Sequence, residues 1–256
     1  MQHRLQRMVS SNITHMSVAM VCLCVSALST LAADGASRVM LRQEVSRTHR
    51  DELVASLRVI TGWTNLNFDT NGALRLDDDQ LRGGSKGARI LLSQAIEGTK
   101  LIVLEDASSR SDVAFCRVVR GRWIRGESSR PPVYVVLIDF TDFHRLTGDA
   151  EARAAFDVGW GLLHEIDHVA RDSEDATTTS KTTGECEDHI NQMRLELGLP
   201  IRVDYFFSPA YLKADANFNS KYVRLSFARQ TKRYWLVWDS TTVGGLLADN
   251  QRALVR

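Results

Sequence analysis

The chain has 256 residues, of which 44% are hydrophobic and 25% are charged, a composition typical of a globular protein with a sizeable core. Lysine and arginine together number 32, aspartate and glutamate 31, and the formal net charge is +1. This balance excludes the strong basic field on which non-specific nucleic-acid binding depends, so we expect no nucleic-acid partner.

Residues 1–33 have the pattern of a secretory signal peptide. Arg4 and Arg7 precede an apolar stretch at residues 16–31, and two alanines follow it. The pattern predicts export to a periplasmic or extracellular location, with no stable membrane insertion after cleavage. The alternative is an uncleaved N-terminal anchor, because the apolar stretch approaches the ~20 residues that span a bilayer.

Residues 37–256 are predicted to form one domain. Residues 39–63 have apolar side chains at helical spacing, and residues 66–78 suggest two short strands around an Asn-Gly turn. Residues 85–99 return to helical spacing. Three segments rich in β-branched and aromatic residues are predicted as strands of a small sheet, at residues 100–107, 112–121 and 131–140.

The second half is predicted to contain two helices and a hairpin. One long helix runs from Asp149, its N-cap, to Arg171. The polar tract that follows is a loop. Its acidic run at residues 172–176 has three carboxylates that could hold calcium but lacks the spacing of a known calcium loop, so it reads as a solvated turn. A helix over residues 185–200 has a capping box formed by Thr182 and Glu185, with Gly198 at its C-terminal end. Two further strands, at residues 221–229 and 233–240, form a C-terminal hairpin.

The sequence GLLHEIDHVA, at residues 161–170, places two histidines one helical turn apart. His164 and His168 can therefore present two nitrogens to one metal ion at ~2.0–2.1 Å. Glu165 projects to the side of this pair, where a general base would reach a water molecule. The opposite, apolar face of the helix is formed by Leu162, Ile166 and Val169.

The stretch HEIDHVARDSEDATTTSKTTGECE, at residues 164–187, resembles the gluzincin metallopeptidases, in which HExxH is followed about 18 or 19 residues later by a glutamate on the next helix. The resemblance covers about 25 residues. It implies a zincin-like α+β fold with a small mixed or antiparallel sheet before two metal-binding helices. It also implies Zn²⁺ bound by His164, His168 and Glu187, with Glu165 as the catalytic base.

The third ligand has alternatives. Glu185 and His189 flank the opposite side of the same helical stripe, so either replaces Glu187 if the helix is rotated. Asn191 is a candidate hydrogen-bond partner for a ligand on this helix. Several residues are candidates for stabilising an oxyanion, and none stands out: Tyr205, Tyr211 and His189.

We therefore expect an exported zinc-dependent metallohydrolase that acts on a peptide or protein substrate. The strand at residues 131–140 is a candidate exposed edge for aligning an extended peptide. The alternative is a secreted, non-enzymatic module with a structural zinc, whose fourth position Cys186 or His189 would fill. A chance motif without metal is a third option, and a Cys116–Cys186 disulfide is left open.

Overall fold

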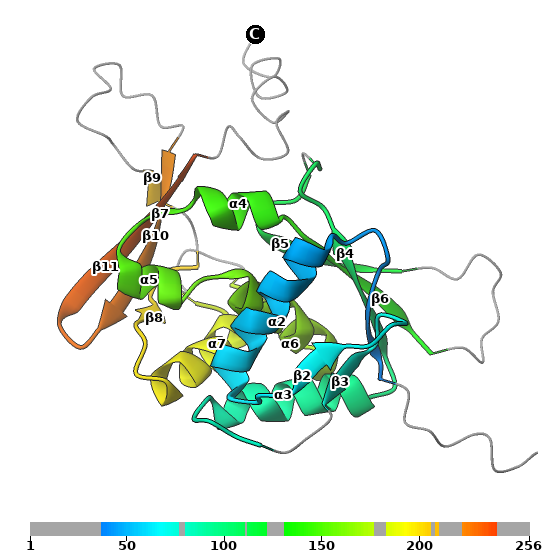
Figure 1. Cartoon of the computed structure of the whole chain (residues 1–256). Helices are drawn as coiled ribbons and strands as arrows, with labels where there is room; N and C mark the ends of the chain where they lie inside the picture. The colour runs from blue at the N-terminus through cyan, green and yellow to red at the C-terminus, as the bar shows by residue number, and fades with distance from the viewer. Residues whose placement is uncertain are drawn as a thin grey trace, which may run out of the picture. The chain divides into compact units, whose positions relative to one another are not determined.

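A computed structural model describes residues 37–76, 80–110, 112–121, 131–176, 183–205, 208–209 and 222–239 (Figure 1). Contacts divide the chain into two units, Met1–Ala36 and Ser37–Arg256, and all described residues belong to the second. The signal peptide predicted for residues 1–33 lies outside the described residues. Among the helices that are described, none is long and apolar enough to cross a bilayer.

The second unit is of the α+β class, as the sequence predicts, and its principal sheet is mixed. The strand order is β1-β4-β6-β5. β1 (Val39–Leu41), β4 (Leu101–Asp106) and β6 (Val133–Ile138) are parallel, whereas β5 (Cys116–Arg120) is antiparallel to β6. The prediction of an exposed edge at residues 131–140 is wrong, because β6 is paired on both sides and the edge strands of this sheet are β1 and β5.

The predicted C-terminal hairpin is confirmed. β10 (Tyr222–Arg229) and β11 (Lys232–Asp239) pair in antiparallel register. Alternate side chains of β11 are buried in the core, namely Tyr234, Leu236 and Trp238. Three short strands extend this sheet: β8 (Ile201–Arg202) and β9 (Ser208–Pro209) pair with β10, and β7 (Thr147–Gly148) pairs with β11.

The hairpin predicted at residues 66–78 is also confirmed. β2 (Leu66–Phe68) and β3 (Leu74–Leu76) pair in antiparallel register. Gly72 in the turn has a φ of +82°, a left-handed conformation that glycine adopts without steric cost.

Six helices lie within the described residues: α2 (Arg47–Thr61), α3 (Lys86–Glu97), α4 (Phe140–Arg145), α5 (Ala150–Ala154), α6 (Val158–Arg171) and α7 (Glu185–Glu196). The HExxH helix, α6, contacts α2, α3 and α7 and also packs against β5 and β6. In Figure 1, α6 lies behind α2 and beside α7. Leu162, Ile166 and Val169 are buried in the core, as predicted.

The first predicted helix begins later than expected. Residues 39–41 form β1, because Val39 and Leu41 are buried where the strand pairs with β4. α2 begins at Arg47, after Ser46, whose hydroxyl accepts a hydrogen bond from the main-chain N–H of His49. Helical spacing of apolar residues alone did not show this boundary.

The single helix predicted from Asp149 to Arg171 is divided into α5 and α6. Asp157 caps α6, because its carboxylate accepts hydrogen bonds from the N–H groups of Gly159 and Trp160. The hydroxyl of Ser56 donates to the same carboxylate at 2.8 Å. Asp149 does not cap α5 through its side chain, which instead accepts from the main-chain N–H of Trp235.

The start of α7 differs from the predicted capping box. The N-cap is Gly184, which makes no side-chain capping bond, and Thr182 lies outside the described residues. At the other end, Gly198 has a φ of +67°, as expected for a glycine that terminates a helix.

Candidate metal centre

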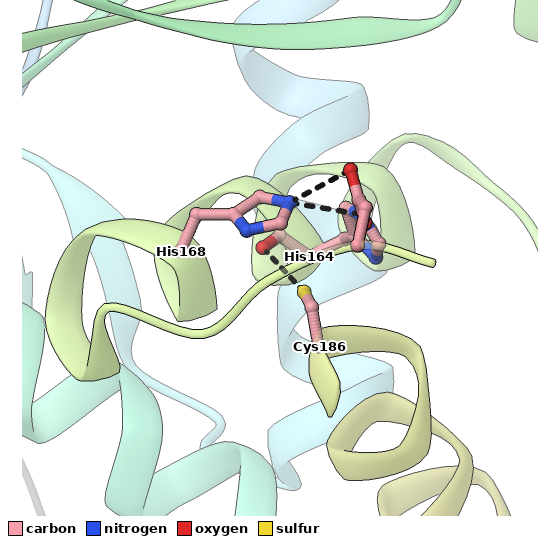
Figure 2. Close-up of side chains that lie close together, drawn as sticks. His164, His168 and Cys186 are labelled. Carbon is pink, nitrogen blue, oxygen red and sulfur yellow. Dashed lines mark hydrogen bonds and ion pairs between the residues drawn. The ribbon is translucent and has the colours of Figure 1, made fainter. Parts of the chain in front are cut away.

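Two histidines on α6 direct their Nε2 atoms at each other. His164 Nε2 and His168 Nε2 are 3.2 Å apart, and Figure 2 shows the His168 ring pointing toward His164. Two nitrogens bound to one tetrahedral ion at ~2.0–2.1 Å would be about 3.3–3.4 Å apart. The spacing of the two imidazoles therefore fits a shared metal ion.

Asp175, in the loop after α6, contacts both imidazoles. Its Oδ1 lies 3.1 Å from His164 Nε2, and its Oδ2 lies 3.4 Å from His168 Nε2. The prediction of a solvated turn at residues 172–176 is wrong for Asp175. Asp172, with a φ of +54°, ends α6 in the left-handed conformation that commonly terminates helices. The sequence signal that could have identified Asp175 was the acidic loop directly after the motif helix.

Cys186 is a fourth potential ligand. Its thiol projects from α7 toward α6 and donates a hydrogen bond to the main-chain oxygen of His164 at 3.2 Å (Figure 2). The potential ligand atoms of His164, His168, Asp175 and Cys186 all lie within 4.8 Å of one another. Cys116 and Cys186 are free thiols, so the disulfide left open by the sequence is not formed here.

Glu187 lies on the other side of the His164 ring. Its carboxylate is 1% exposed, with Oε2 3.4 Å from His164 Nδ1. Arg194 and Arg202 both donate to it. Burial raises the pKa of Glu187, but the two guanidinium charges outweigh burial and hold that pKa well below its usual range. Glu187 therefore faces Nδ1 of His164 as an ionised carboxylate, opposite the Nε2 atom that meets His168.

The two alternative ligands lie elsewhere on α7. Glu185 is exposed, and His189 Nδ1 contacts the carboxylate of Asp167 at 2.8 Å. Asn191 accepts a hydrogen bond from Arg194 at 2.8 Å. Its connection to Glu187 is therefore indirect, through the guanidinium group that both side chains share.

Hydrogen bonds fix the orientation of His168. Its Nδ1 lies 2.8 Å from the main-chain oxygen of Ser173, which leaves Nε2 for Asp175 and His164. Burial lowers the pKa of His168, but contact with the Asp175 carboxylate outweighs burial and raises it to about 11. Burial raises the pKa of Asp175, and the two imidazoles reverse this and lower it well below its usual range. A metal ion must displace protons from this network.

Tyr205 is the one oxyanion candidate that the described structure brings to this cluster. Its hydroxyl donates to Asp175 Oδ2 at 2.6 Å, and its ring is stacked against His164. Tyr211 lies outside the described residues.

Glu165 lies beside the cluster, at the edge of the principal sheet. Its carboxylate is 8% exposed, and Oε2 accepts a hydrogen bond from the N–H of Val118 on β5 at 2.8 Å. Burial raises its pKa above the usual range, although the charges of His164 and His168 act in the opposite direction. A raised pKa makes this carboxyl group a better proton acceptor than an exposed glutamate, as a general base requires.

A cavity of about 180 Å³ adjoins Glu165 and His164. Its walls include four aromatic side chains, those of Phe115, Phe156, Trp160 and Tyr205. Glu187 also lines it, together with Arg194 and Arg202. The candidate base therefore faces a space that combines apolar walls with a charged end.

No protein-family model, curated protein or solved structure matches this chain. The chemistry of this site therefore follows from the arrangement of its side chains.

Proposed function

We propose that this protein is a zinc-dependent hydrolase that cleaves peptide bonds in a peptide or protein substrate. His164, His168 and Asp175 are the proposed metal ligands, and Glu165 is the proposed general base. The observation that carries the proposal is the 3.2 Å separation of the two Nε2 atoms, each on a ring whose Nδ1 faces an oxygen acceptor. The resemblance of residues 164–187 to gluzincins, and hence to a zincin-like fold, supports it.

The contacts favour Asp175 over Glu187 as the third ligand. Asp175 has one carboxylate oxygen against each Nε2 atom. Glu187, the ligand implied by the resemblance, is bound by two guanidinium groups and faces the opposite ring nitrogen of His164. A carboxylate that faces the other ring nitrogen of a metal-binding histidine orients the ring and increases its basicity. We propose this role for Glu187.

His164, His168 and Asp175 would hold the zinc ion, which would supply Lewis-acid chemistry toward the substrate carbonyl and an attacking water. As the oxygen of the attacking water bonds to the substrate's carbonyl carbon and the C–N bond breaks, Glu165 would take the water's proton at Oε1, because Oε2 already accepts a hydrogen bond from the N–H of Val118. Its raised pKa then allows it to return that proton to the leaving amine. Because Glu165 is buried, bulk water has little access to its carboxylate and does not compete for the proton that it carries.

β5 is the proposed strand for substrate alignment. Among the described strands it pairs only with β6, and the N–H of Val118 points away from β6 toward Glu165. An extended peptide that pairs with this edge passes beside the general base. The sequence favours residues 131–140 for this role. We propose the neighbouring strand, β5, in their place.

A structural zinc site is the second candidate function, and Cys186 is the observation that favours it. A thiolate together with His164, His168 and Asp175 would give four protein ligands and a closed coordination shell. In that case the protein is a secreted, non-enzymatic module, and Glu165 has no chemical task.

Substitution of Glu165 separates the two functions. For a hydrolase we expect about one zinc per chain in both wild type and Glu165→Gln, because Glu165 is not a ligand. Cleavage of a peptide library should fall by about 10²–10⁴-fold in the variant. Metal analysis and mass spectrometry of the cleaved library provide the two measurements. Glu185→Gln, at an exposed position on α7, is the control that should keep both properties.

Two results would count against the hydrolase. A folded, zinc-loaded wild type that cleaves nothing in the library favours the structural site. Full zinc content in His164→Ala rejects the metal centre itself, since that variant lacks an imidazole of the pair.

A further inference from the structure

A second hydrogen-bonded group lies behind the metal centre, and the proposed catalysis does not use it. Its centre is Asp167 on α6, whose side chain is fully buried. Ser173 Oγ donates to Asp167 at 2.7 Å, His189 Nδ1 lies 2.8 Å from it, and Arg171 donates at 3.0 Å. A buried carboxylate with three partners is a fixed anchor, because loss of any partner leaves desolvated charge.

This anchor joins three separate segments of the chain. Asp167 belongs to α6, His189 to α7, and Ser173 to the loop that carries Asp175. Ser173 also bonds to the metal centre directly, because its main-chain oxygen lies 2.8 Å from His168 Nδ1. Hydrogen bonds therefore connect α7 through Asp167 to the side chain of Ser173, and the main-chain oxygen of the same Ser173 contacts a proposed ligand.

We propose that Asp167, Ser173 and His189 form a positioning clamp for the metal centre. The clamp holds the His168 ring with Nε2 toward the metal position, and it holds the loop two residues before Asp175. This inference rests on the proposed metal site. None of the three clamp residues touches the proposed metal position, so each acts through His168 or Asp175.

The loop needs such a clamp because residues 172–176 have no regular secondary structure. One main-chain hydrogen bond, from the N–H of Cys186 to the oxygen of Glu174, attaches the loop to the start of α7. Without the Ser173 attachment, the loop must be ordered when metal binds, and the lost conformational entropy lowers affinity. Outer hydrogen-bond partners of metal ligands typically contribute ~10–100-fold to metal affinity.

Ser173→Ala tests the clamp, and Ser108→Ala is its matched control. Ser108 Oγ donates to Asp106 at 2.6 Å, so both substitutions remove a short hydroxyl–carboxylate bond, but only Ser173 contacts the metal centre. His189→Gln is the second test, with the exposed neighbour Asp188→Asn as its control. Zinc affinity is measured by competition with a chromophoric chelator, and stability by urea unfolding of the zinc-free proteins.

We expect Ser173→Ala and His189→Gln to weaken zinc binding by about 10–100-fold, and both controls to stay within about twofold of wild type. Ser108→Ala should lower stability about as much as Ser173→Ala. A merely structural Ser173 would show the loss of stability without the loss of affinity. Wild-type zinc affinity in both clamp variants overturns the inference.

A second readout needs no metal. In the zinc-free wild type, NMR should show a downfield, slowly exchanging Nδ1 proton on His168, because Ser173 accepts it. This exchange should accelerate in Ser173→Ala and stay unchanged in Ser108→Ala. If the wild type binds no zinc, the proposed function fails and this readout alone decides: faster exchange only in Ser173→Ala retains the clamp, and equal exchange overturns it.

Discussion

Asp175 and Glu187 both face His164, and their different surroundings give them different tasks. The Glu187 charge is balanced by Arg194 and Arg202, and withdrawing it to bind a metal would leave two guanidinium groups without that partner. Asp175 is balanced by the two imidazoles, whose protons a metal ion replaces. The exchange of protons for metal at Asp175 therefore keeps every buried charge compensated.

We predict that Asp175→Asn weakens zinc binding more than Glu187→Gln does. The first change removes a proposed ligand, whereas the second removes a partner of the His164 ring and should cost about 10–100-fold. Zinc affinities from chelator competition give the order. The reverse order assigns the third ligand to Glu187, as the gluzincin resemblance implies, and makes Asp175 its outer partner.

We predict that Arg194→Met destabilises the protein by about 3–5 kcal/mol, because it leaves Glu187 buried beside one guanidinium group instead of two. The Arg194 side chain also packs over the Trp160 ring. Adding Glu187→Gln should recover part of the loss, since it removes the buried carboxylate charge that Arg202 alone then balances. The control is Arg47→Met, whose exposed ion pair with Asp51 should contribute under ~1 kcal/mol.

The midpoints of urea unfolding for zinc-free proteins check this prediction. A loss in Arg194→Met no larger than in the Arg47 control would show that the buried charge is compensated in another way.

At the scale of elements, α6 needs glycine where other elements approach it. A Cβ atom on Gly159 would lie 2.2 Å from Ser56 Oγ and 2.9 Å from Ile60 Cδ1, both on α2. On Gly161, a Cβ atom would lie 2.7 Å from Phe143 and 2.9 Å from the thiol of Cys116. The HExxH helix is therefore packed closely on two sides, which fixes the direction of its histidine face.

Gly159→Ala should destabilise the protein, although alanine is favoured over glycine by up to ~1 kcal/mol inside a helix. The added methyl group meets Ser56, which is held in place by its bonds to Asp157. Gly87→Ala in α3 is the control, because its nearest neighbour is the flexible side chain of Met193 at 3.0 Å. In thermal unfolding, Gly159→Ala should have a lower unfolding temperature than the wild type. Gly87→Ala should have a higher or an unchanged one. A stabilised Gly159→Ala would contradict the packing.

The sequence predicts elements well where the signal is local. The Asn-Gly turn and the alternation of Tyr234 and Leu236 suffice for their hairpins. The break between α5 and α6 has a local signal in Asp157, which caps α6, but the same carboxylate also accepts from Ser56, which lies 101 residues earlier in the chain, and no local pattern contains that contact. The interior position of β6 likewise depends on distant pairing partners.

The candidate site divides in the same way. Helical spacing is enough to pair His164 with His168. Asp175 could not be found from periodicity, because it lies in an irregular loop whose position depends on Asp167 and Ser173. The ion pairs of Glu187 were also hidden, since Arg202 lies beyond α7 on a different element.

At the scale of the whole unit, one buried carboxylate connects three distant parts. Asp142 on α4 accepts hydrogen bonds from the main-chain N–H of Phe115, just before β5, and from the indole N–H of Trp238 on β11, each at 3.2 Å. It links the principal sheet, a helix and the C-terminal hairpin. Burial, with the nearby charge of Asp139, raises the pKa of Asp142 to about 6.

This raised pKa makes stability depend on pH. An aspartate in the unfolded chain has a pKa of about 3.9, so between about pH 4 and 6 the folded state holds a proton on Asp142 that the unfolded state has lost. Asp142 therefore increases the free energy of unfolding as the pH falls from about 7.5 to 5. It lowers that free energy as the pH rises through about 6. This direction is opposite to that of a carboxylate whose pKa is lowered by an ion pair.

We predict that the wild type gains free energy of unfolding, relative to Asp142→Asn, when the pH is lowered from 7.5 to 5. The variant cannot titrate at this position, and groups remote from it contribute equally to both proteins, so the difference between the two curves reports Asp142 together with its coupling to Asp139. Urea unfolding of the zinc-free proteins at several pH values measures it. Asp188→Asn, at an exposed position, should run parallel to the wild type. A parallel curve for Asp142→Asn as well would show that Asp142 stays ionised in the folded protein throughout this range.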